Sequence, residues 1–375
     1  MLVLVLVAAV LFDVWLPTQI PWEPARLASL PALRADGLVL QDERADEVWA
    51  TRGYGIYRSR GSDPFERIAI LAPRIGPAWA GFSRTFRDTM RYQELVEVMV
   101  LDDGTLLAFA GGDVYRVDRS GEASGPLHRL RYFGPGRGRG LMPQGLTRDS
   151  DGAIYYGEYP TGAMAPGETV RVWRSLDEAR TWEVAYEFPP GAVRHVHAVQ
   201  WDPVGRALWV ATGDEDAECR VGYSQDGGAT FRWVGSGSQR FRAVSFLFTR
   251  EAVLWAMDTL SAERHVVRWD RASNAISESA TALPDAGYYA TGLDDETGLV
   301  SLGETGASLW RVEDGEPSLL HAWRVVPDPR RPHPVVRLLR RAPTKPPEAV
   351  FLNPLRTETE SAAIYRIEAA AVLSR

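Results

Sequence analysis

The sequence contains a single cysteine, Cys219, among its 375 residues. One cysteine excludes an intrachain disulfide and any zinc site that is built from several thiolates. Lysine is equally rare, since Lys345 is the only one and arginine supplies the remaining positive charge. Because a GC-rich genome also produces an excess of arginine, we attach no functional meaning to the abundance of that residue.

The chain also lacks a basic surplus. It carries 42 basic and 49 acidic side chains, which gives a net charge of -7. Proteins whose main partner is a nucleic acid need a positive surface to bind phosphates. The composition therefore excludes nucleic acid as the main partner. With 45% hydrophobic and 10% aromatic residues, the chain has the composition of a folded globular protein.

One apolar run stands out, MLVLVLVAAVLF at residues 1–12. It has the length of the apolar core of a signal peptide and is too short to span a bilayer, but it lacks a basic n-region and a clear cleavage site. We expect residues 1–16 to be a signal remnant or membrane anchor, or alternatively a buried strand. The first two alternatives predict an extracytoplasmic or membrane-anchored protein. The proline-containing residues 17–36 are expected to form a linker or a packed arm.

Two segments of the sequence match one another closely. SLDEARTW at residues 175–182 and SQDGGATF at residues 224–231 share the pattern Ser-x-Asp-x-(Gly/Ala)-x-Thr-(Trp/Phe). In such a turn the aspartate accepts backbone N–H groups and a glycine adopts a positive φ. Ala179 occupies the position that glycine has in the second segment, and it is destabilising there if its φ is positive.

These two segments carry the Asp-box pattern, and the chain resembles the BNR/Asp-box repeat β-propellers, which include the sialidases. Each segment lies in a longer unit of short strands separated by turns, and fainter copies of this unit recur along the chain. We therefore predict an all-β fold, with residues 37–375 forming one β-propeller of about seven four-stranded blades, six or eight being the alternatives. Such a protein is expected to be a monomer.

The repeat places polar residues where the second strand of each unit ends. In a propeller these ends converge on one face around the axis, so carboxylates that recur at this position suggest a site there. The ordinary alternative is that acidic residues simply begin polar loops. The six positions are Arg52, Gly112, Glu158, Asp214, Asp258 and Glu304.

The residues at or just before the start of the first strand of each unit add basic groups to the same face. His195 and His197 are separated by one residue, so on a strand they point in the same direction. They are candidates for acid–base groups or for ligands of a divalent metal, with Glu158 or Asp214 as a third ligand, although we assign no metal site from the sequence. The alternative is two structural histidines, one packed and one hydrogen-bonded to a carbonyl.

Glu158 and Tyr159 form a carboxylate–tyrosine pair, which is the chemistry that sialidases use. An acidic sugar would also require arginines, and Arg52, Arg194 and Arg242 are the candidates. The sequence has no Phe/Tyr-Arg-Ile-Pro motif near the start of the propeller, which the sialidase family carries. The family's three-arginine assignment therefore cannot be transferred, and sialidase activity is not expected.

The sequence thus predicts an exported propeller that binds an acidic oligosaccharide or polysaccharide. Whether it also cleaves this ligand is left open; if it does, the chemistry is of the hydrolase or lyase type. The predicted catalytic residues are His195, His197, Glu158, Tyr159 and Asp214, and the predicted substrate-binding residues are Arg52, Arg194, Arg242, Asp258 and Glu304. The alternative is a non-catalytic scaffold for protein recognition or assembly. A pocket in which these side chains converge would favour the first hypothesis.

Overall fold

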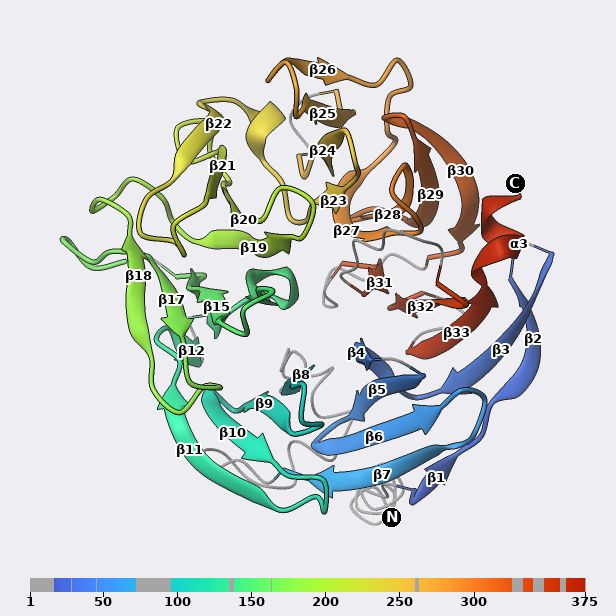
Figure 1. Cartoon of the computed structure of the whole chain (residues 1–375). Helices are drawn as coiled ribbons and strands as arrows, with labels where there is room; N and C mark the ends of the chain where they lie inside the picture. The colour runs from blue at the N-terminus through green and yellow to red at the C-terminus, as the bar shows by residue number, and fades with distance from the viewer. Residues whose placement is uncertain are drawn as a thin grey trace, which may run out of the picture.

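The chain forms a ring of seven blades around a central axis in the computed structural model (Figure 1). The structure describes residues 17–27, 29–44, 46–71, 96–134, 138–162, 164–259, 263–325, 333–339, 347–357 and 362–374. The predicted all-β fold and the seven four-stranded blades are therefore confirmed. The apolar segment 1–16 lies outside the described residues.

Six of the blades are antiparallel meanders in which the first strand is innermost. The first is made of β4 (Val39–Arg44), β5 (Glu47–Arg52), β6 (Gly55–Arg60) and β7 (Phe65–Ile70), and the second of β8 (Val96–Val100), β9 (Leu106–Ala110), β10 (Asp113–Val117) and β11 (Ala123–Arg129). The third contains β14 (Leu146–Arg148), β15 (Ile154–Gly157), β17 (Arg171–Ser175) and β18 (Glu183–Glu187), and the fourth β19 (Val196–Asp202), β20 (Ala207–Thr212), β21 (Arg220–Ser224) and β22 (Arg232–Ser236). The fifth contains β23 (Leu247–Phe248), β24 (Ala252–Ala256), β25 (Val266–Asp270) and β26 (Ile276–Glu278), and the sixth β27 (Ala286–Gly292), β28 (Thr297–Gly303), β29 (Ala307–Glu313) and β30 (Glu316–Trp323).

The seventh blade closes the ring with strands from both ends of the chain. Its inner strands are β31 (Val335–Leu338), β32 (Ala349–Leu355) and β33 (Ala363–Glu368), and β3 (Leu30–Asp36) pairs with β33. Outside it lies β2 (Glu23–Leu27), while β1 (Gln19–Ile20) pairs with β7 of the first blade. Residues 17–36, expected to be a linker or arm, thus supply strands to two blades, and the sheet structure does not begin at residue 37.

The remaining elements are short. A three-stranded sheet is made of β12 (Phe133–Gly134), β13 (Gly138–Gly140) and β16 (Tyr159–Pro160), and two 3₁₀ helices, η2 (Pro143–Gly145) and η3 (Gln239–Phe241), precede β14 and β23. The helix α3 (Ala369–Leu373) follows β33. No helix among the described residues combines the length and apolar character that crossing a membrane requires.

Burial follows the position of a strand in its blade. Every residue is buried in β9, β15, β20, β24, β28 and β32, all of which are second strands. In contrast, no residue of β11, β18, β22 or β26 is buried, and these are outermost strands. Because neighbouring blades cover both faces of an inner strand, its sequence is mostly apolar and does not alternate, and the few polar residues in it are buried too.

Large aromatic side chains fill the space between blades. Trp209 of the fourth blade contacts Phe246 and Trp269 of the fifth, with ring centroids 5.5 and 5.3 Å apart. Trp209 is almost completely buried. Rings of this size contribute a large buried area, so these contacts fix one blade against the next and hold the strand ends around the axis.

The two matching turns have the same hydrogen bonds. Thr181 donates to Asp177 through its backbone N–H and its hydroxyl, at 2.8 and 2.7 Å, and Thr230 donates to Asp226 in the same way at 2.9 and 2.6 Å. Each turn connects the third and fourth strands of its blade. The turns therefore stabilise the outer part of the blade and lie away from its inner strands.

The backbone of Ala179 has the positive φ that its place in the first turn requires. Its φ is +66°, and the corresponding glycine in the second turn, Gly228, has a φ of +87°. Both backbone N–H groups donate to the serine that begins the turn, at 2.8 Å. Since a positive φ is costly for any residue with a Cβ, the first turn carries the strain that its sequence predicts.

Candidate functional site

One pocket lies where the strand ends of the third to seventh blades converge. Its volume is about 620 Å³. Its lining is polar and consists of Met142, Tyr159, His197, Asp214, Glu215, Asp216, Gln239, Arg242, Val244, Asp258, Thr259, Tyr288, Glu304 and His333. Six of the ten predicted site residues belong to this lining, namely Tyr159, His197, Asp214, Arg242, Asp258 and Glu304.

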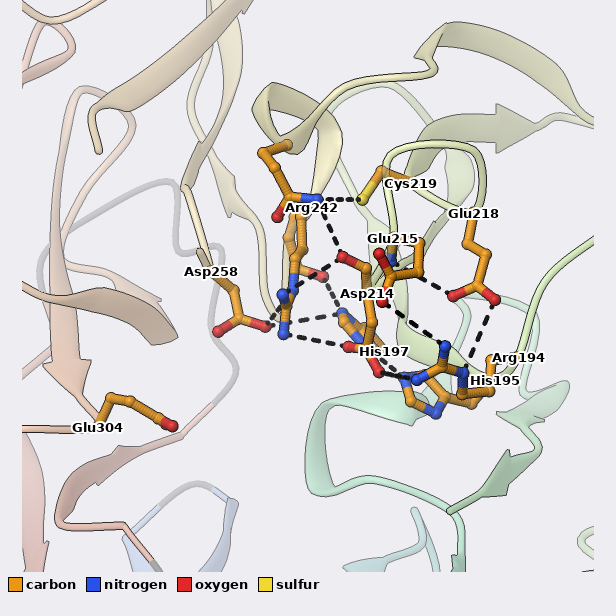
Figure 2. A network of polar contacts seen from close by, with 12 residues as sticks. Arg194, His195, His197, Asp214, Glu215, Glu218, Cys219, Arg242, Asp258 and Glu304 are labelled. Atoms are coloured by element: carbon orange, nitrogen blue, oxygen red, sulfur yellow. Dashed lines mark hydrogen bonds and ion pairs between the residues drawn. The ribbon is translucent and has the colours of Figure 1, made fainter. Parts of the chain in front are cut away.

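The two histidines are buried side by side at the start of β19. Each directs its Nδ1 at a backbone carbonyl, His195 at Pro160 (3.0 Å) and His197 at Ala243 (3.2 Å). A carbonyl oxygen can only accept, so each Nδ1 carries a proton and donates it. Their Nε2 atoms lie 2.9 Å apart, and each is 3.4 Å from an oxygen of Asp214 (Figure 2). Burial lowers the pKa of His197 to about 4, so this ring is neutral at pH 7.

Asp214, which follows β20, is surrounded by nitrogen atoms. Besides the two histidines, Arg242 approaches its Oδ1 at 3.1 Å and Arg194 approaches its Oδ2 at 3.3 Å. Burial by itself would raise the pKa of Asp214, but the close contacts with His195 and His197 outweigh it and hold that pKa well below its usual range. Asp214 is therefore a carboxylate at neutral pH.

Asp258, one blade further, has the opposite character. Its Oδ2 contacts Nε of Arg242 at 3.2 Å, and its side chain is almost completely buried. Burial raises its pKa to about 7, with Arg242 lowering that value and the charges of Asp214 and Glu304 raising it. Arg242 lies between the two aspartates, and Glu304 lies on the other side of Asp258 (Figure 2).

Glu304 has a strained backbone at the end of β28. Its φ is +100°, a conformation that a residue with a Cβ rarely adopts. Tyr288 donates its hydroxyl to Oε2 at 2.6 Å, and Nε2 of His333 lies 3.1 Å from Oε1. Strain of this kind persists where the surroundings enforce it, and it is concentrated at functional sites.

Two tyrosines complete the polar wall. The ring of Tyr159 stacks on His195 with centroids 4.2 Å apart, and burial raises its pKa to about 12. Burial also raises the pKa of Tyr288, and the neighbouring Asp258 and Glu304 raise it further. Both phenols are therefore protonated at neutral pH. Tyr288 donates its proton to Glu304, whereas Tyr159 can donate a hydrogen bond to a ligand.

Glu158, predicted to face the pocket, instead lies in the interior of the third blade. Its carboxylate is fully buried and accepts hydrogen bonds from Nε1 of Trp173 (2.8 Å) and the backbone N–H of Arg171 (3.0 Å), with Arg131 at 3.1 Å. Burial raises its pKa despite these contacts. Its neighbour Tyr159 points into the pocket, because successive side chains of an extended chain face opposite ways.

The remaining predicted residues are not part of the described lining. His195 lies behind His197, and Arg194 contacts Asp214, Glu215 and Glu218. The guanidinium of Arg52 lies against Gly37, where a Cβ would come within 2.9 Å of Nη1. The side chain of Arg52 therefore fills the space beside Gly37, between β3 and β4, and this space is open because glycine has no Cβ.

Sequence reasoning missed Tyr288 and His333. Tyr288 lies in the innermost strand of the sixth blade, near its start, as His197 does in the fourth. Aligning the first strand of the sixth repeat with that of the fourth would have identified Tyr288 as a candidate. His333 precedes β31 in the blade whose repeat is faintest in the sequence, so no comparable signal identified it.

The charge of the lining bears on the kind of ligand. Asp214, Glu215, Asp216 and Glu304 are opposed by Arg242, which is already paired with Asp214 and Asp258. The described lining is thus more acidic than basic. An anionic sugar unit requires an additional positive charge in this pocket.

Comparison with known proteins supports the fold alone. No family model matches the sequence, and no curated protein matches it. Among solved structures, the chain is similar to one from a study of two prolyl endopeptidases (TM-score 0.52, 14% identity, 97% of this chain and 50% of that chain). It is also similar to the GH74 enzyme of Niastella koreensis (TM-score 0.50, 14% identity, 76% of this chain and 44% of that chain). The chain spans half or less of the length of both proteins.

Proposed function

We propose that this propeller binds a glycan in the central pocket and hydrolyses a glycosidic bond there. The observation that carries the proposal is the placement of Asp258 and Glu304, two carboxyl groups from successive blades, in the wall of one polar pocket. Most glycoside hydrolases use two carboxyl groups on either side of the scissile bond, one as an acid and one as a carboxylate.

The hydrogen bonds assign the two roles. Glu304 accepts the hydroxyl hydrogen of Tyr288 on one oxygen, and its other oxygen faces Nε2 of His333, so its two oxygens are placed as hydrogen-bond acceptors. Asp258 is held by Arg242 through one oxygen, and its burial favours the protonated form. Asp258 therefore serves as the acid and Glu304 as the base.

In the proposed reaction Asp258 gives its proton to the leaving oxygen as the bond from the anomeric carbon to that oxygen breaks. Glu304 takes a proton from a water molecule, whose oxygen forms the new bond to the anomeric carbon. A third proton transfer, from Glu304 through solvent to Asp258, restores both groups. Tyr159 and Tyr288 offer hydroxyl groups and aromatic faces that suit sugar rings.

The test is an assay of reducing ends on paired neutral and acidic oligosaccharides, preceded by thermal-shift measurements on the same panel. Pairs of this kind, such as cellulose and glucuronan fragments, also test whether the glycan is acidic. We expect Asp258→Asn and Glu304→Gln each to reduce kcat by about 100-fold or more. Glu313→Gln is the matched control, because Glu313 is an exposed carboxylate on the sixth blade that pairs with Arg311.

Equal rates in the wild type and both carboxyl variants would contradict the proposal. So would the absence of stabilisation and turnover across the panel, since a ligand that binds the folded state raises its apparent stability. That result would favour the non-catalytic scaffold.

A further inference from the structure

The histidine pair has a feature that acid–base chemistry leaves unexplained. Because both Nδ1 atoms are directed at backbone carbonyls, His195 and His197 turn their Nε2 atoms toward the same point. The oxygens of Asp214 are acceptors aimed at that point as well. With both Nε2 atoms unprotonated, the three groups converge as acceptors, and a cation placed between them satisfies all three.

We propose that His195, His197 and Asp214 form a binding site for a divalent transition-metal ion. Their ligand atoms all lie within 4.8 Å of one another. At an ordinary metal–ligand distance of about 2.1 Å, the 2.9 Å between the two Nε2 atoms corresponds to an angle of roughly 90° at the metal. The 3.4 Å from each Nε2 to its own oxygen of Asp214 corresponds to roughly 110° when both oxygens bind. These angles lie within the range of octahedral and tetrahedral coordination, so little movement is needed to admit an ion.

The outer contacts are those that a metal site requires. Histidine ligands in proteins donate their other ring N–H to a carbonyl or carboxylate, which fixes the ring and its tautomer. Here both rings are fixed in this way, and Tyr159 stacks on His195. Arg194 and Arg242 hold the two oxygens of Asp214 and orient the carboxylate.

The two arginines do not make the site positive. Arg242 also contacts Asp258, while Arg194 also approaches Glu215 and Glu218 at 3.8 and 3.7 Å. Even without Asp258, which is protonated in the proposed reaction, the three carboxyl groups of Asp214, Glu215 and Glu218 surround the two guanidinium groups. This excess of carboxyl groups over guanidinium groups favours the binding of a divalent cation.

The donor set indicates which ions fit. Two imidazole nitrogens and one carboxylate suit zinc, manganese, iron or cobalt, whereas calcium and magnesium prefer oxygen ligands alone. His197 and Asp214 also line the pocket, so an ion held by them would keep open positions toward a ligand. Such an ion would supply the positive charge that an anionic sugar needs. The inference does not depend on the proposed hydrolysis.

The test is titration of the full-length, chelator-treated protein with ZnCl₂ or MnCl₂ by isothermal calorimetry, with CaCl₂ for comparison. We expect one equivalent of Zn²⁺ or Mn²⁺ to bind and Ca²⁺ to bind much more weakly. His197→Gln and Asp214→Asn should weaken Zn²⁺ binding by about 100-fold or more. His321→Gln is the control, because His321 lies on β30 beside Trp323, outside the pocket.

Anomalous diffraction from zinc-soaked crystals of the wild type makes the test independent of whether a variant folds. A peak bonded to both Nε2 atoms supports the inference. A missing peak, or stoichiometric binding that survives in both site variants, overturns it. Because binding is measured without a glycan, this result is separate from the outcome of the hydrolysis assay.

Discussion

At the scale of single residues, two aspartates of the same pocket are held in opposite states. Asp214 contacts two histidines and two arginines, whereas Asp258 has one arginine and is buried. Both follow the second strand of successive repeats, so the pattern predicts their location. It cannot predict their difference, because that depends on which neighbouring atoms face each oxygen.

His128 provides a prediction about stability. Its ring lies beside Trp173 and Trp182, and its Nε2 lies 2.8 Å from the hydroxyl of Tyr156. Burial lowers its pKa to about 4 from an ordinary 6.5. Below pH 6.5 the unfolded chain therefore binds a proton that the folded chain does not, and stability decreases until the pH reaches about 4.

We expect this histidine to reduce the free energy of unfolding by roughly 1 kcal/mol between pH 6.5 and pH 4.5, less than the full pKa difference gives because the ring is partly exposed to solvent. Urea unfolding of the wild type and His128→Gln at pH 7, 6 and 5 measures the effect. The variant should be less stable at pH 7 but lose less stability on acidification. Parallel pH profiles for the two proteins would show that His128 has no such effect.

At the scale of elements, the matching turns provide a second prediction. A Cβ at Gly228 would lie 3.1 Å from Cβ of Ala185, and the φ of +87° is unfavourable for alanine. Gly228→Ala should lower the free energy of unfolding by about 2 kcal/mol. Gly191→Ala isolates the backbone contribution, since Gly191 has a φ of +72° and a Cβ added there would have no other atom within 4 Å.

We expect Gly191→Ala to cost about 1 kcal/mol, so that the difference between the variants reports the contact with Ala185. Thermal or urea unfolding of both variants gives the two values. If Gly228→Ala were no more destabilising than Gly191→Ala, the contact of the added Cβ with Ala185 would not be destabilising.

Elements also show where sequence reasoning succeeded and failed. The blade repeat predicted the strand ends that carry Asp214, Asp258 and Glu304, because turn and strand patterns are local. It missed the strands of residues 19–36, where prolines obscure the pattern. Strands at the edge of a sheet tolerate proline because one side of the backbone has no partner, and Pro24 lies in such a strand, β2.

At the scale of the whole molecule, the ring depends on the pairing of β3 with β33. Leu33 and Arg366 are register partners in this pairing, and both are partly exposed. A disulfide in the double variant Leu33→Cys, Arg366→Cys would close a very long loop. We expect the oxidised form to be more stable than the reduced form by about 2–5 kcal/mol.

The reduced form of the same protein is the control, and Cys219 is buried and should not react. Thermal unfolding with and without reductant gives the comparison, after a thiol assay has verified the bond. If the oxidised and reduced forms melted at the same temperature, separation of β3 from β33 would not limit the stability of the ring.

The shared seventh blade also constrains how the protein can be made. Its strand β3, at residues 30–36, is synthesised before the six other blades, but its partner β33 emerges after them, with residues 363–368. One edge of β3 can pair with β2 at once, but the edge that pairs with β33 stays open until the six other blades have been synthesised. During that interval its unpaired edge is a hazard for aggregation, and a chaperone that shields nascent strands would act there.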